Sequence, residues 1–348
     1  MEMQKIKEHE LCVNYSQKHR FMVLCSNLYS SSLLLSVVSK GVKIGIYSVS
    51  KKNEIFLSKK FILVPFLGIF TETLLSLEAA RNNNYLLSWV EKQQSWGKYV
   101  FSLVQVKADF PDLSESALKR ALDRLSNKGR ILSVYKGFYL IVPPEYTSRG
   151  LLPPMLFIDS LMKFIHKPYY VGLLSAAALH GSAHQQPQEF FVVTDTKQIA
   201  TIKKGLKINY ITKKEIPENL LENRKTESGF VKVSSPELTA ADIIYYNSRI
   251  GGINRAASVI NELAEVMKPE KIIPELINTL TVPTIQRLGY LLEVVLEQKI
   301  LSDKLYKESQ KIKKEFFRQP LKAGIEKIGF QKNDRWKIII NTDIEIDE

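Results

Sequence analysis

The chain has 348 residues, of which 45% are hydrophobic and 24% are charged, and this length and composition predict two folded domains with sizeable cores. Its 49 Lys and Arg outnumber its 36 Asp and Glu, which gives a net charge of +13 and favours a polyanionic partner such as nucleic acid or an acidic protein surface. Only two cysteines occur, Cys12 and Cys25, so the rest of the sequence holds no disulfide scaffold, cysteine metal cluster or thiol nucleophile. This cysteine usage fits a reducing cytoplasm.

Residues 1–72 differ in organisation from the rest of the chain. Val42–Tyr47 and Glu54–Leu63 alternate weakly, like short strands, whereas the serine-rich segment Ser30–Ser39 predicts a loop. Basic residues precede the apolar stretch Phe21–Val38 as in a signal peptide, but acidic residues are mixed among them, and the stretch is too broken for a membrane helix. We expect an unassigned extension, either disordered or a mis-called start that lies upstream of the real one.

Residues 73–150 carry a regular pattern of three helices. The first has its apolar residues on one stripe and stops before Gly97, and the second is short and stops at Pro111. Ser114 caps the third, SESALKRALDRLSNKG, whose stripe of Ala and Leu ends at Gly129. Two β-rich runs joined by a tight turn follow the third helix. Three helices and a hairpin predict a winged helix-turn-helix, in which the third helix lies in the major groove of DNA.

The face of the third helix opposite its apolar stripe is cationic, and the hairpin adds further basic residues. Amide and guanidinium groups on that face can reach base edges, while basic residues of the wing contact phosphates. From Ser76 to Gly150 there are 11 basic and 7 acidic residues, and this net charge of +4 supports DNA contact. A merely solvated helix face and a protein-binding winged helix are the alternatives. The predicted DNA-binding residues are Ser116, Lys119, Arg120, Arg124, Asn127, Lys128, Arg130 and Lys136.

Residues 151–300 predict an α+β domain with a helix-rich second half, which makes the whole chain α+β. Turn-forming residues around Gly150 mark the start of this domain. The expected helices are 155–165, 173–179, 238–246, 253–266, 271–280 and 284–297, and the expected extended segments are 169–171, 190–193, 206–211 and 230–233. Residues 301–348 are a charged tail, which we expect to be peripheral.

Two sets of polar residues in this domain have a catalytic interpretation and a plainer one. His180 and His184 are spaced like helical metal ligands, but HGSAH contains a glycine and lacks the glutamate of the zinc-protease motif, so capping or packing is the favoured role. Glu189 and Asp195 flank a predicted strand, with Lys197 nearby. This set loosely resembles the Mg²⁺-binding residues of nucleases, but its order and spacing do not match well.

A glycine pair, Gly251 and Gly252, follows Arg249 and precedes a helix. Free amides there could bind phosphate, but a turn between helices is the favoured interpretation. The sequence contains no Gly-rich phosphate loop, no Ser-His-Asp order and no other paired catalytic carboxylates. We therefore expect a binding protein and not an enzyme, with no catalytic residues, no cofactor and no metal.

Four segments of the sequence are similar to one known family. They read YLLSWVEKQQSWGKYVF, then SESALKRALDRLSNKGRILSVYKGFYLIVPPEY, then YYVGLLSAAALHGSAHQQPQEFFVVT, and finally SSPELTAADIIYYNSRIGGINRAASVINEL. They resemble the AbiEi antitoxins, which are partners of AbiEii-type nucleotidyltransferase toxins, from about Leu77 to about Glu297. The last segment resembles the family's aspartate-containing helix pair, here with Asp242. Residues 1–72 match nothing in the family.

The resemblance implies an antitoxin of a type IV toxin–antitoxin system, which is an abortive-infection defence against phage. Its winged helix would bind inverted repeats in its own promoter, and its C-terminal domain would counter the toxin without a tight complex. The family's basic recognition helix corresponds here to Lys119, Arg120, Arg124 and Lys128, with Arg130 and Lys136 on the wing. The alternatives are a stand-alone winged-helix regulator whose C-terminal domain senses a ligand or partner, and an Mg²⁺-dependent nuclease that uses Glu189 and Asp195.

Overall fold

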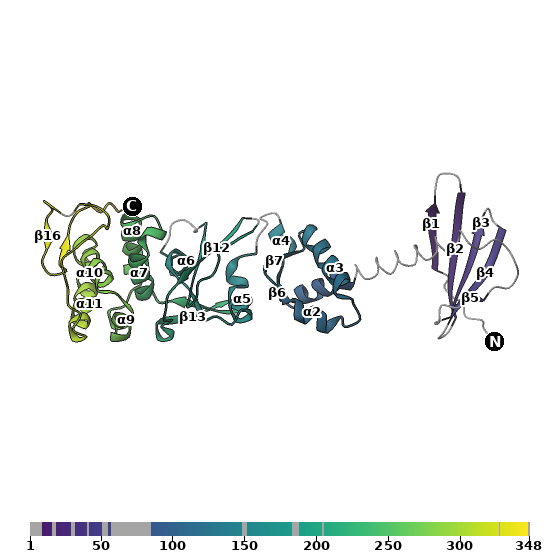
Figure 1. Cartoon of the computed structure of the whole chain (residues 1–348), viewed down its shortest axis with the longest axis horizontal. Coiled ribbons are helices and arrows are strands. Elements are labelled where there is room, and N and C mark those ends of the chain that lie inside the picture. Colours follow the sequence, from purple (N-terminus) through teal and green to yellow (C-terminus); the bar gives the residue numbers. More distant parts are fainter. Residues whose placement is uncertain are drawn as a thin grey trace. The chain divides into compact units, whose positions relative to one another are not determined.

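A computed structural model (Figure 1) describes residues 85–346 of the chain apart from 148–151, 183–187, 204 and 327, together with the backbone of five strands before residue 57. The chain divides into two compact units, Met1–Ala80 and Arg81–Glu348. Among the described residues, no helix is both long and apolar enough to cross a membrane.

The first unit contains a five-stranded antiparallel sheet whose strands follow their order in the chain. They are β1 (His9–Tyr15), β2 (His19–Leu28), β3 (Ser32–Ser39), β4 (Val42–Ser50) and β5 (Ile55–Phe56). β4 confirms the extended segment predicted at 42–47. The loop expected at 30–39 is wrong for β3, because main-chain pairing with β2 and β4 outweighs the turn preference of its serines. The other residues of segment 1–72 lie outside the described part.

The second unit begins with three helices and a three-stranded antiparallel sheet of order β6-β8-β7. A helix over residues 85–95 is followed by β6 (Val100–Ser102), α2 (Leu103–Asp109), α3 (Glu115–Asn127), β7 (Ile131–Tyr135), β8 (Phe138–Ile141) and α4 (Pro144–Thr147). Ser114 caps α3 as predicted, because its Oγ accepts a hydrogen bond from the Ala117 amide at 3.2 Å. Gly137 has a φ of 77°, which permits the tight turn between β7 and β8.

The hairpin of β7 and β8 is apolar on both faces. One face, with Ile131 and Ile141, packs against the three helices. The other face, with Val134 and Phe138, shares a core with Phe157 of the following domain. Because apolar surface on both sides of a sheet is stabilised only when both sides leave water, the hairpin is covered twice. It therefore joins the helical module to the rest of the unit.

A six-stranded mixed sheet forms the centre of the second unit, in the order β11-β12-β10-β9-β14-β13. Its strands are β9 (Tyr169–Val171), β10 (Phe190–Thr194), β11 (Thr201–Lys203), β12 (Leu206–Thr212), β13 (Leu221–Thr226) and β14 (Gly229–Ser234). Successive residues of β10 enter different cores. Phe191 and Val193 pack on the side of α6 (Leu173–Leu179), and Val192 packs on the side of α5 (Ile158–Phe164).

The four extended segments that the sequence predicts in this domain are confirmed as β9, β10, β12 and β14. β11 and β13 are the two edge strands, and the sequence pattern does not predict them. The reason is visible in β13, whose sequence LENRKT is mostly exposed and charged. Charged side chains are typical of edge strands, because they discourage pairing with other chains, but they remove the apolar alternation that identifies a strand.

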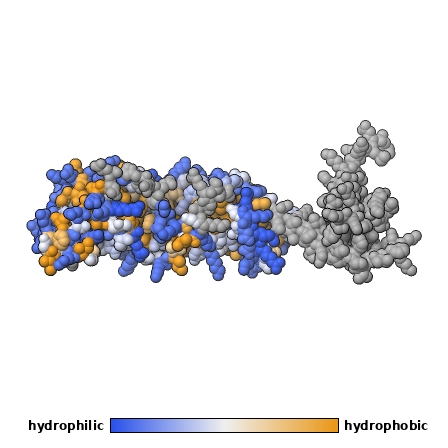
Figure 2. All heavy atoms as spheres, turned by 90° about the horizontal axis from the view of Figure 1, so that it is seen from above, coloured by the Kyte–Doolittle hydropathy of each residue, from blue (hydrophilic) through white to orange (hydrophobic). Residues whose placement is uncertain are grey.

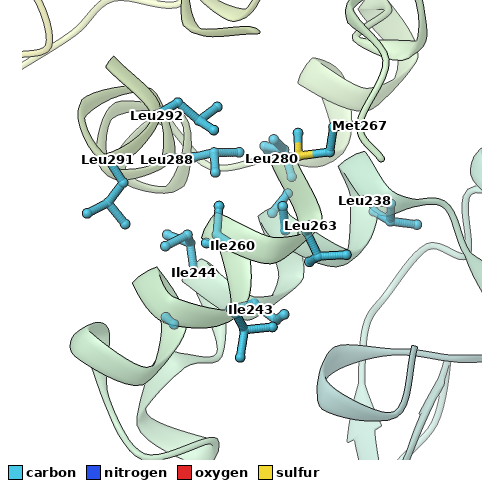
Figure 3. Close-up of a cluster of buried hydrophobic side chains, with 14 of the residues drawn as sticks. Leu238, Ile243, Ile244, Ile260, Leu263, Met267, Leu280, Leu288, Leu291 and Leu292 are labelled. Atoms are coloured by element: carbon cyan, nitrogen blue, oxygen red, sulfur yellow. The ribbon is translucent and has the colours of Figure 1, made fainter. Parts of the chain in front are cut away.

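Helices dominate the second half of the unit, as predicted, and the mixed α+β class is confirmed. They are α7 (Pro236–Tyr245), α8 (Ile253–Ala264), α9 (Pro274–Thr279), α10 (Val282–Tyr290) and α11 (Lys299–Lys311), with a π-helical turn, η5 (Leu291–Val295), after α10. Their apolar faces meet in one core, part of which is shown in Figure 3 around Ile244, Ile260 and Leu288.

The charged tail is not peripheral, which corrects the expectation for residues 301–348. Leu301 and Leu305 of α11 are buried, and Trp336 is fully buried in the same core as α7 and α10. Three short strands of order β15-β17-β16 hold this segment: β15 (Gln319–Pro320), β16 (Lys332–Asn333) and β17 (Ile338–Ile339). A few large apolar side chains anchor the tail, although most of its residues are polar.

Candidate functional site

The exposed side of α3 carries six of the predicted DNA-binding residues. Ser116, Lys119, Arg120, Arg124, Asn127 and Lys128 are all exposed, while Leu118, Ala121, Leu122 and Leu125 are buried on the opposite side. The side chains of the two lysines and two arginines form no hydrogen bond or ion pair with the described residues. Figure 2 shows hydrophilic residues gathered over the end of the described surface where Figure 1 places α3.

Three of these cations form one row along the helix. Arg120, Arg124 and Lys128 are spaced by four residues, so their side chains project from the same side of α3. A row of this length matches what an α-helix presents to the major groove, where a guanidinium group can bind guanine O6 and N7 together. The row is therefore the part of the predicted site that the structure brings together.

The two hairpin residues of the predicted set are placed differently. Arg130 is half-buried and forms an ion pair with Glu91 at 3.0 Å, so its guanidinium group is held within the helical module. Lys136 is exposed in the turn, beside Tyr135, whose ring lies 6.3 Å from that of Phe164 in α5. β7 separates Lys136 from the end of α3 by about 17 Å, at about 3.3 Å per residue. Lys136 therefore lies at the end of the hairpin that meets the central domain.

A second polar site lies in the central domain, around the buried carboxylate of Asp242. Tyr170 of β9 donates its hydroxyl to Asp242 Oδ2 at 2.6 Å, and Lys213, just after β12, donates to Oδ1 at 2.8 Å. The side chains of Asp242 and Lys213 are only 3% and 13% exposed. A charge buried this deeply is stable only when it is paired and hydrogen-bonded, and both carboxylate oxygens are satisfied here.

Two tyrosine hydroxyls around Asp242 stay protonated over the ordinary pH range. Burial raises the pKa of Tyr170 well above its usual value, and the negative charge of Asp242 raises it further. Burial and the same charge also raise the pKa of Tyr246, whose hydroxyl donates to the Thr212 carbonyl at 3.1 Å. Both groups therefore act as hydrogen-bond donors and not as bases.

A cavity of about 160 Å³ opens beside this network. It lies between the end of β12, α7 and the turn from α9 to α10, and its lining includes Lys214, Tyr245, Thr279 and Thr281. Hydroxyl groups and the exposed Lys214 make it a polar site that can donate hydrogen bonds. The described residues contain no group of three or more His, Cys, Asp or Glu side chains that could hold a metal ion.

Comparison with known proteins identifies the central domain. Residues 170–294 match the family model of the AbiEi antitoxin C-terminal domain. The chain carries an AbiEi antitoxin domain. The match confirms the predicted resemblance and includes all three residues of the network, Tyr170, Lys213 and Asp242, and it indicates a role in toxin–antitoxin or abortive-infection biology.

The fold itself is shared with a solved structure. The crystal structure of the RV2827C protein from Mycobacterium tuberculosis superposes with a TM-score of 0.53 and 14% sequence identity, over 72% of this chain and 89% of that chain. At this identity the likeness establishes the fold alone. No curated protein matches the sequence at a significant level.

Within the AbiEi domain, His180 has a packing role. It ends α6, its Nε2 donates to the Ser234 carbonyl at 2.7 Å, and its Nδ1 accepts from Arg224 at 3.1 Å. Because the carbonyl can only accept and the guanidinium can only donate, this arrangement describes a neutral imidazole with both nitrogens engaged. His184 lies outside the described residues.

Glu189 and Asp195 do not form one carboxylate site. They lie just before and just after β10, and six residues of strand separate them by about 20 Å. Glu189 instead contacts Lys207 and Asn209, and Asp195 accepts a hydrogen bond from Thr196 at 3.0 Å. Two carboxylates at opposite ends of a strand cannot bind the same Mg²⁺ ion.

The pair Gly251 and Gly252 forms a turn before α8. Both residues have positive φ, 106° and 98°, which favours glycine, and the Gly252 amide donates to the Asn247 carbonyl at 2.8 Å. An engaged amide supports the turn interpretation and not a phosphate site.

Sequence reasoning names Asp242 only through the family resemblance, and it does not find Tyr170 or Lys213. A signal for the network does exist. Asp242 stands in α7, where nearly every residue is buried, and a carboxylate in such a helix needs a buried partner. The partner itself is not readable from spacing, because it comes from a strand end far away in the chain.

Proposed function

We propose that the chain is the antitoxin of a type IV toxin–antitoxin system. It counteracts a nucleotidyltransferase toxin and represses its own operon by binding promoter DNA. The match of residues 170–294 to the AbiEi antitoxin domain carries this proposal. The unpaired cationic row on α3, in the module that precedes this domain, supports the DNA-binding half of it.

The DNA-binding part is a winged helix-turn-helix at 73–150. Its three helices, with β6, β7 and β8 packed beside them, are the elements that this fold requires. In such a module the third helix enters the major groove, and a palindromic operator takes two copies, one for each half-site. The row of Arg120, Arg124 and Lys128 then faces the bases of an inverted repeat.

The antitoxin part is the α+β domain at 151–300, with the tail after residue 300 packed into its core. Its partner is an AbiEii-type nucleotidyltransferase, opposed in the cytoplasm without a stable complex. We propose that the domain acts by binding and not by catalysis. In the described residues, the polar groups around Asp242 are hydrogen-bonded to one another and include no pair of a nucleophile and a base.

Replacing both Arg120 and Arg124 with alanine is expected to weaken binding to the chain's own promoter. If each arginine reads a guanine edge, each substitution costs about 1–3 kcal/mol of binding free energy, and discrimination against unrelated DNA falls as well. Fluorescence anisotropy with a labelled promoter duplex and an unrelated duplex measures both effects. The double variant Lys299→Ala, Lys307→Ala is the matched control, because it removes two exposed positive charges from α11.

Equal promoter affinities of the wild type and the Arg120→Ala, Arg124→Ala variant would refute α3 as the recognition helix. Binding to distant promoters but not to its own would instead favour a stand-alone regulator.

A further inference from the structure

The turn after the first helix of the module holds an exposed tryptophan between two lysines. Trp96 is 57% exposed, and the Nζ atoms of Lys92 and Lys98 lie 5.0 and 5.3 Å from its ring centroid. The other two tryptophans have structural roles: Trp89 donates to Asp109, and Trp336 is fully buried. We call Lys92, Trp96 and Lys98 the Trp96 patch. A large aromatic ring left in water beside two cations is typical of a contact surface.

Backbone hydrogen bonds place this patch beside the end of α3. The Ile141 amide donates to the Tyr99 carbonyl at 2.8 Å, and the Val142 amide donates to the Arg130 carbonyl at 2.9 Å. The starts of β6 and β7 therefore flank the end of β8, about 10 Å apart at two strand spacings. Because Trp96 and Lys98 lead into β6 and Lys128 leads into β7, the patch and the end of the cationic row lie at the same edge of the sheet.

The carboxylates next to the patch are already engaged elsewhere. Glu91 forms an ion pair with Arg130, and Glu227 accepts a hydrogen bond from the Tyr99 hydroxyl at 3.2 Å. Neither Lys92 nor Lys98 forms an ion pair with a described residue. The two ammonium groups therefore remain available to an external anion, and the row on α3 points to nucleic acid as its source.

We propose that the Trp96 patch is a second DNA contact, which binds the sugar–phosphate backbone beside the base pairs read by α3. The lysines contact phosphates, the indole ring packs against deoxyribose, and the indole N–H donates to a phosphate oxygen. These contacts position the protein and carry no sequence information. The inference rests on the proposed promoter binding by α3 and adds a surface outside the recognition helix and the wing.

The salt dependence of binding tests the proposal on the full chain. Each lost phosphate contact lowers the slope of log K against log [salt] by about 0.9, so Lys92→Ala, Lys98→Ala is expected to lower it by about 1.8. Affinity for the promoter and for an unrelated duplex should fall by the same factor. The control Lys299→Ala, Lys307→Ala should keep the wild-type slope, whereas Arg120→Ala, Arg124→Ala should lose discrimination between the two duplexes.

Fluorescence gives a second readout that does not depend on charge removal. The signal of Trp96, taken as the difference between the wild type and Trp96→Phe, is expected to become less accessible to acrylamide when promoter DNA is added. Wild-type DNA binding with an unchanged slope in Lys92→Ala, Lys98→Ala would overturn the proposal, as would unchanged quenching. Loss of antitoxin activity without any change in DNA binding would assign the patch to a protein partner and overturn it too. A wild-type chain that binds no promoter DNA would overturn the DNA-binding function itself.

Discussion

Trp336→Ala is expected to lower the free energy of unfolding by about 3–5 kcal/mol, as for other fully buried large side chains. The indole ring stacks on Phe316 at 5.7 Å and meets Tyr306 edge-on at 5.4 Å, and its N–H donates to Glu293. Truncation leaves a cavity between α10 and the tail, and it removes the partner of a carboxylate oxygen. Urea denaturation followed by circular dichroism measures the change. Wild-type stability would contradict the placement of the tail in the core.

A substitution at Gly289 tests the same contact from the other side. A Cβ at this position would lie 2.2 Å from the Trp336 ring, so Gly289→Ala is expected to destabilise the chain by about 1–3 kcal/mol through overpacking. In the Trp336→Ala background the same change should cost much less, because the methyl group enters the space left by the ring. Additive costs in the double variant would show that the two residues do not touch.

Lys213→Ala is expected to destabilise the chain by about 3–5 kcal/mol, because it leaves the Asp242 carboxylate buried without its cation. Tyr170→Phe, which removes one hydrogen bond to the same carboxylate, should have a smaller effect of about 1.5–3 kcal/mol. Lys214 provides a matched control, since it is the next residue, is exposed and has no ion pair within the described residues. Lys214→Ala should stay within about 0.5 kcal/mol of the wild type. Equal effects of Lys213→Ala and Lys214→Ala would contradict the buried pair.

The sequence predicts those elements whose signals are local. α3 has a capping serine, a periodic apolar stripe and a terminating glycine, and its exposed row of cations is visible in the same 16 letters. The helices after residue 235 are predicted for the same reason. β13 and the tail are not, because an edge strand can be charged throughout and a tail can be anchored by Trp336 alone.

Long-range pairings account for the rest. Asp242, Lys213 and Tyr170 meet only because β9, β12 and α7 pack in one domain, and no spacing rule joins a strand end to a distant helix. The double burial of the hairpin could have been noticed, since β7 and β8 are apolar on both faces. The Trp96 patch likewise depends on the register of β6, β7 and β8.

Growth rescue tests the antitoxin function most directly. The neighbouring nucleotidyltransferase is expressed in a heterologous host, alone and with the full chain, from promoters that the chain does not control. We expect the wild-type chain to restore growth, and the Arg120→Ala, Arg124→Ala variant to restore it equally, because neutralisation belongs to the AbiEi domain and not to the DNA-reading helix. Continued growth arrest in the presence of folded wild-type chain would contradict the antitoxin function.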